Sequence, residues 1–137
     1  MIDVEILGAA TAASAPSAPE MRAICAAAAA ARGVRDGHVA IEFVGAERIA
    51  QLNGVHRGKP AATDVLSFPV DGIEPQMRAQ GAGPPRELGD IVICPEHTED
   101  LREAIVHGML HLLGMDHERD DGEMLVLQRR VLAGGAG

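Results

Sequence analysis

The chain has 137 residues and a formal net charge of −8, with two Phe, no Trp and no Tyr. We expect residues 1–137 to form a single domain, because a chain of this length can bury one core. The negative charge argues against indiscriminate binding to nucleic acid, and the scarcity of aromatic residues argues against a base-stacking platform. The N-terminus lacks a basic signal and the longest apolar stretch is too short to cross a bilayer, so we expect a soluble, cytoplasmic protein.

Two kinds of apolar periodicity run through the chain, and together they predict strands and helices. Strands are predicted at residues 2–7, 38–45, 63–70 and 90–95, and helices at residues 19–33, 46–58, 96–114 and 121–132. Residues 71–89 predict a flexible loop, and residues 133–137 a frayed tail. The interspersed elements predict an α+β fold with a small mixed sheet of about four strands and about four to five helices.

Proline and glycine mark the expected boundaries of several elements. Pro19 opens the first helix and Gly33 follows its end, while its alanine run predicts a thin helix packed close on a sheet. The second helix closes near Gly54 or Gly58. Pro69 makes the third strand an edge strand, because proline has no amide hydrogen to donate across a sheet.

The two cysteines, Cys25 and Cys94, lie far apart in the sequence and form no CxxC pair. A disulfide framework is not indicated, and the alternative is that one of the two thiols approaches a metal. We therefore expect two buried thiols.

Residues 107–117 read HGMLHLLGMDH and hold three of the six histidines. His107 and His111 are four positions apart, so on a helix both imidazoles can reach one ion. Gly114 can adopt the left-handed conformation that ends a helix and turns the chain back, which would bring His117 in as a third ligand. Catalytic zinc is held by three protein ligands with an open fourth position, so the motif predicts one zinc ion.

The spacing of this motif is also that of the metzincin proteases, which carry a glutamate directly after the first histidine. Gly108 stands at that position here. A glycine can neither take a proton from a water molecule nor give one to a leaving amine, so the pattern disfavours peptide hydrolysis.

The chain resembles the YbeY family of single-strand-specific metallo-endoribonucleases, whose signature is HGxLHLxGxDH. Residues 52–69, LNGVHRGKPAATDVLSFP, are similar to the LNxxxRxxxxxTDVLSFP segment of that family, and LGDIVIC is similar to the strand that follows it. The resemblance implies a zinc-hydrolase-like (metzincin-like) core, one Zn²⁺ held by His107, His111 and His117, and a catalytic role for Arg57 in RNA cleavage. It also implies maturation of ribosomal RNA, notably at the 3′ end of the small-subunit RNA, and ribosome quality control.

The partners implied by the resemblance are single-stranded RNA, ribosomal RNA and the ribosome, with no DNA and no membrane. Two alternatives stay open: a zinc hydrolase of another substrate class, such as a peptidase or amidase, and a non-catalytic ribosome-associated factor with structural zinc. The family places a longer segment before the histidine motif than the twelve residues from Pro95 to Val106. We therefore expect a shortened helix or loop and a trimmed substrate cleft.

Several polar residues lie beside these motifs without a clear catalytic role. Asp116 either orients an imidazole or caps the turn after Gly114, and Lys59 adds a point charge beside Arg57. The others are expected to face solvent or to line the cleft without taking part in chemistry: Thr63, Asp64 and Ser67 on the edge strand, and His56 and His97 on the surface.

Overall fold

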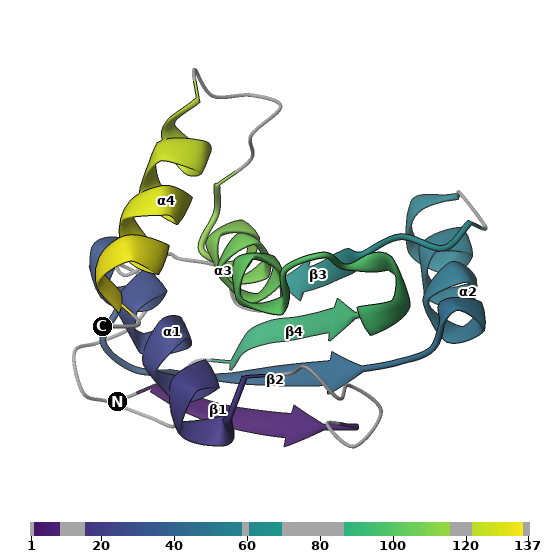
Figure 1. Cartoon of the computed structure of the whole chain (residues 1–137), viewed down its shortest axis with the longest axis horizontal. Coiled ribbons are helices and arrows are strands. Elements are labelled where there is room, and N and C mark those ends of the chain that lie inside the picture. Colours follow the sequence, from purple (N-terminus) through teal and green to yellow (C-terminus); the bar gives the residue numbers. More distant parts are fainter. Residues whose placement is uncertain (1, 9–15, 59–60, 70–86, 116–121, 136–137) are drawn as a thin grey trace.

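The computed structural model of the chain describes residues 2–8, 16–58, 61–69, 87–115 and 122–135. Within these ranges the α+β fold is confirmed, with four helices and a four-stranded sheet (Figure 1). The strands are β1 (Ile2–Leu7), β2 (Gly37–Phe43), β3 (Val65–Pro69) and β4 (Glu87–Ile93). The helices are α1 (Ala18–Ala31), α2 (Ala46–Arg57), α3 (Leu101–Leu112) and α4 (Glu123–Gly135), with a short 3₁₀ turn, η3 (Pro95–His97).

The sheet is mixed, with strand order β1-β2-β4-β3. Strands β1, β2 and β4 are parallel, and β3 runs antiparallel to β4. Strand β3 lies at the edge, as Pro69 predicts, because that residue has no amide hydrogen for a further strand. Strand β4 therefore has a neighbour on each side, and five of its seven residues are buried.

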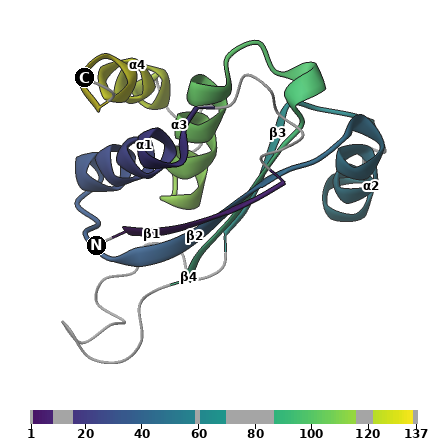
Figure 2. The ribbon, with the colours of Figure 1, turned by 60° about the horizontal axis from the view of Figure 1, so that its bottom comes forward.

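Helices cover both faces of the sheet, but unequally. Figure 2 shows α1, α3 and α4 on one face and α2 beside one end of the strands. Ile91 and Ile93 of β4 belong to the main core with α1 and α3, whereas Val92 packs with Ile49 and Leu66 in a second cluster. Because neighbouring strand residues point to opposite faces, α2 covers the face opposite α3.

The alanine-rich helix α1 packs closely on its neighbours, as predicted. The Ser17 hydroxyl accepts a hydrogen bond from the amide of Glu20 at 3.3 Å and caps the first turn. Ala28 and Ala29 are fully buried, so the small side chains let α1 approach β1, α3 and α4. None of the described helices combines the length and apolar character needed to cross a lipid bilayer.

Both cysteines are buried, which confirms the expectation from their spacing. Burial raises the pKa of the Cys25 thiol to about 12. Cys25 is therefore un-ionised at neutral pH and acts as a small apolar side chain.

Two predicted boundaries are wrong, because β4 and α4 are longer than expected. Residues Glu87 to Gly89, assigned to the loop, open β4, since they pair with His38 and Val39 of β2. The tail predicted from residue 133 is helical as far as Gly135. The remaining part of the predicted loop, residues 71–86, lies outside the described residues.

The helix predicted over residues 96–114 is also wrong, since it is divided into η3 and α3. One carboxylate oxygen of Asp100 accepts hydrogen bonds from the amides of Arg102 at 3.0 Å and Glu103 at 3.2 Å. These two amides have no helical carbonyl to donate to, so Asp100 starts a new helix there. The segment from Pro95 to Val106 therefore consists of η3, a link that ends at Asp100, and the first half of α3.

Candidate metal centre

His107 and His111 lie one turn apart on α3, with their rings edge to face and the ring centres 4.6 Å apart. Their Nε2 atoms are 3.1 Å apart. Two imidazole nitrogens bound to one tetrahedral zinc ion at about 2.0–2.1 Å lie about 3.3 Å from each other. The two nitrogens therefore already converge at the spacing that a shared zinc ion requires.

Gln128 of α4 contacts the first of these histidines and was missed by the sequence reasoning. Its Oε1 atom lies 3.1 Å from Nδ1 of His107, and the glutamine is only 5% exposed. An amide oxygen can only accept, so Nδ1 of His107 donates and carries the ring hydrogen. Nε2 of His107, which lies 3.1 Å from Nε2 of His111, then carries the lone pair; this is the tautomer that a ligand bound through Nε2 needs.

A sequence signal for Gln128 does exist. Met124 and Val131 are buried on the same face of α4, four positions before it and three positions after it. A polar residue on an otherwise apolar helix face needs a buried hydrogen-bond partner. The identity of that partner, 21 positions earlier in the chain, could not be read from the pattern.

Gly108 lies where α3 packs closely on the sheet. A β-carbon built on it would come within 2.7 Å of Cγ2 of Ile91, a fully buried residue of β4. The hydroxyl of Ser67 on β3 donates to the Gly108 carbonyl at 3.2 Å, which ties the edge strand to the same point of the helix. The site therefore has no room for the glutamate that metzincin proteases carry at this position.

The turn after α3 has the conformation predicted for Gly114, whose φ is +92°. The amide of Met115 donates to the carbonyl of Leu110 at 2.9 Å, a bond that closes the helix end. His117 and Asp116 lie outside the described residues, so the third ligand stays a prediction. Within the described ranges, no group of three His, Cys, Asp or Glu residues is placed to hold a metal ion.

A pocket of about 500 Å³ opens beside His107 and Gln128, between the start of β3, the link before α3, and α4. Exposed His97 and Leu125 line it as well, so His97 is on the surface as expected but shares a pocket with His107. Its walls also hold four carboxylates: Asp64, Glu99, Asp100 and Glu103. Among the lining residues that the structure describes there is no Lys or Arg, so a phosphate group would meet unfavourable potential from them unless another cation supplied positive charge.

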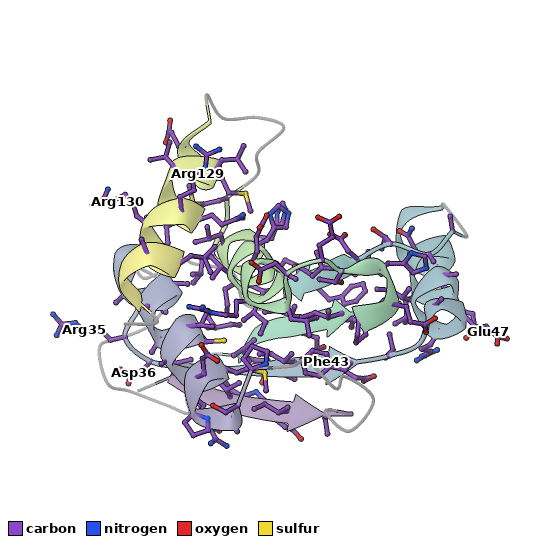
Figure 3. All side chains as sticks on the ribbon, viewed as in Figure 1. Arg35, Asp36, Phe43, Glu47, Arg129 and Arg130 are labelled. Atoms are coloured by element: carbon purple, nitrogen blue, oxygen red, sulfur yellow. The ribbon has the colours of Figure 1, made fainter. Side chains whose placement is uncertain are left out.

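The predicted catalytic cation, Arg57, is the last residue of α2, which packs on the sheet face opposite α3. Gly58 ends that helix with a φ of +71°, as predicted. The side chains of His56 and Arg57, and all of Lys59, lie outside the described part of the chain, so the role of Arg57 stays a prediction. Arg129 and Arg130 project from the exposed side of α4 (Figure 3).

Comparison with known proteins identifies the family of this chain. A family model described as Endoribonuclease YbeY matches residues 13–134. A relative named Endoribonuclease YbeY from Bacillus cytotoxicus is 38% identical over 116 residues, which cover 73% of this chain and 74% of the relative. A relative of the same name from Rubrobacter xylanophilus is 45% identical over 101 residues, which cover 72% of this chain and 67% of the relative.

The fold has a match among solved structures as well. The solution structure of TM1509 from Thermotoga maritima superimposes with a TM-score of 0.50 and 25% identity, covering 94% of this chain and 86% of that one. The family model spans 122 of the 137 residues (13–134), and the fold match covers 94% of the chain. The chain therefore belongs to the endoribonuclease YbeY family.

Proposed function

We propose that this protein is a zinc-dependent endoribonuclease that cleaves single-stranded RNA. The family match supports the endoribonuclease activity. The observation that supports zinc is the 3.1 Å separation of Nε2 of His107 from Nε2 of His111. Maturation of ribosomal RNA at the 3′ end of the small-subunit RNA, association with the ribosome and a cytoplasmic location belong to the same proposal and rest on the family resemblance.

In this proposal the histidines bind the metal and Arg57 binds the RNA. His107 and His111 hold zinc through Nε2, and His117 supplies the third imidazole. When bound, zinc supplies Lewis acidity for a phosphoryl oxygen and activates a water molecule. The guanidinium of Arg57 is a permanent cation whose planar fork suits a phosphate, so it stabilises negative charge that develops during cleavage.

The packing of Gly108 favours RNA over peptide as substrate. A peptidase of the metzincin type needs a carboxylate beside the first histidine, and Ile91 fills that space. The pocket carboxylates make the site dependent on added positive charge when a polyanion approaches. Zinc and Arg57 would provide that charge.

The proposal is tested by metal analysis of the purified protein together with cleavage of single-stranded RNA, with and without a chelator. We expect about one zinc per chain, loss of cleavage on chelation and recovery with added zinc. His111→Ala should lose both zinc and cleavage, whereas Arg57→Ala should keep zinc and cleave slowly. Arg130→Ala removes an equal charge from the exposed side of α4 and should change neither.

Three outcomes would contradict parts of the proposal. Full activity of Arg57→Ala would remove the role of that residue. Cleavage of peptides but not of RNA would indicate a hydrolase of another class. Unfolding on chelation, in a protein without nuclease activity, would indicate structural zinc.

A further inference from the structure

We infer that Gln128 is a positioning residue, which holds His107 in the tautomer and ring orientation needed to bind the metal through Nε2. This inference rests on the proposed function, in which His107 is a zinc ligand. The contact that carries it is the hydrogen bond from Nδ1 of His107 to Oε1 of Gln128, at 3.1 Å. Gln128 lies in the pocket beside His107, and in this scheme it acts on the metal through the histidine.

Because Gln128 is buried, breaking this hydrogen bond is costly. A buried amide that loses its partner cannot turn to solvent, so the ring of His107 and the amide hold each other in place. Neutral imidazole carries its hydrogen on either nitrogen, and only the form with hydrogen on Nδ1 presents a lone pair at Nε2. The acceptor of Gln128 selects that form before any metal arrives.

The helix that carries Gln128 is anchored independently of the histidines. Helix α4 packs against α1 and α3, and Met124 and Val131 bury their side chains in the main core on the same face. The amide is therefore presented to α3 by a helix that the core holds in place. The position of α4 relative to α3 therefore affects how His107 is oriented, although the metal-binding motif ends before α4 begins.

The neutral charge of Gln128 also fits its surroundings. Four carboxylates already line the pocket that His107 and Gln128 share. A carboxylate in place of the amide would orient the ring equally well and make the imidazole a stronger ligand, but it would add a further negative charge where a polyanion must bind. The amide orients the histidine without that charge.

The first test uses metal-free protein and NMR of the imidazole nitrogens, at a pH where the histidines are neutral. In the wild-type protein and in Gln128→Glu, His107 should carry its hydrogen on Nδ1. In Gln128→Leu, which removes the acceptor, the Nε2-protonated form should appear in a substantial fraction. An unchanged tautomer in Gln128→Leu would overturn the inference, whether or not the protein binds zinc.

The second test measures zinc affinity by competition with a chelator. Gln128→Leu should weaken zinc binding about 10- to 100-fold, the usual effect of losing a residue that orients a ligand. Gln128→Glu should bind zinc at least as tightly as the wild-type protein but show a raised KM for RNA with little change in kcat. Equal zinc affinity of Gln128→Leu and the wild-type protein would also overturn the inference.

Controls separate positioning from loss of structure. Val4→Ala shortens a buried side chain on β1, away from α3 and α4 in the sequence of elements, and should leave zinc affinity unchanged while lowering stability in urea. If Gln128→Leu does not fold, Gln128→Met keeps the length of the side chain without the amide and takes its place. A wild-type protein that binds no zinc, yet shows the tautomer change, would overturn the proposed function while the contact between the two residues stands.

Discussion

Replacing Gly108 by alanine adds a single methyl group where α3 meets the sheet, and we expect it to destabilise the protein. The added carbon would lie 2.7 Å from Cγ2 of Ile91 and 3.2 Å from its Cγ1. Ile91 cannot retreat easily, because it is fully buried on a strand with neighbours on both sides. Its branched side chain also has few allowed rotamers.

Two opposing effects set the magnitude of this change. Forcing an extra methyl group into a packed core costs about 1–3 kcal/mol. Alanine in a helix interior is favoured over glycine by about 1 kcal/mol, which offsets part of that cost. We therefore expect the free energy of unfolding to fall by about 1 kcal/mol, with a range of about 0–2 kcal/mol. Gly108→Glu should lower the free energy of unfolding much more, because it also buries a carboxylate.

The assay is equilibrium unfolding in urea, with the change in free energy taken from the shift in midpoint at constant slope. Ala26→Gly, at an exposed position in α1, measures the alanine-to-glycine preference alone and should cost about 1 kcal/mol. A gain of that size in Gly108→Ala would refute the reasoning, because it would mean that Ile91 accommodates the methyl group freely. Combining Gly108→Ala with Ile91→Ala should cost less than the sum of the two single changes.

Three further predictions follow from the remaining described contacts. The pKa of His38 is raised above 6.5, chiefly by its hydrogen bond to Glu87 at 2.8 Å, so stability from this pair should be present below pH 6.5 and lost as the pH rises through the raised pKa. NMR titration of the His38 ring should give a pKa above 6.5, and Glu87→Gln should lower that pKa. A wild-type pKa at or below 6.5 would contradict the role of Glu87. Asp100→Ala should lower the free energy of unfolding by about 1 kcal/mol in urea, while Asp100→Ser should cost little, since serine also caps helices; equal costs would argue against the cap. The buried thiols of Cys25 and Cys94 should react with a disulfide reagent only after unfolding, and rapid labelling of the native protein would show that one of them is accessible.

Local chemistry explains why several features could be read from the sequence. The alternation in residues 2–7 matches β1, and the left-handed glycine at residue 114 lies where the histidine motif required a turn. Each depends on residues close together in the chain. The break between η3 and α3 could also have been predicted, since an Asp followed three residues later by a Glu, as in Asp100 and Glu103, is a common start of a helix. The apolar periodicity continues across this break and therefore predicted one long helix.

Contacts between distant residues account for what could not be read. Glu87 and Gly89 have little preference for a strand and join β4 because β2 lies beside them. The pattern of histidines alone predicted which side chains share a helix face, because helical geometry places residues four apart together. It did not predict that Gln128 would orient His107, nor that Ile91 would fill the space at Gly108, since both depend on how α3 packs against α4 and β4.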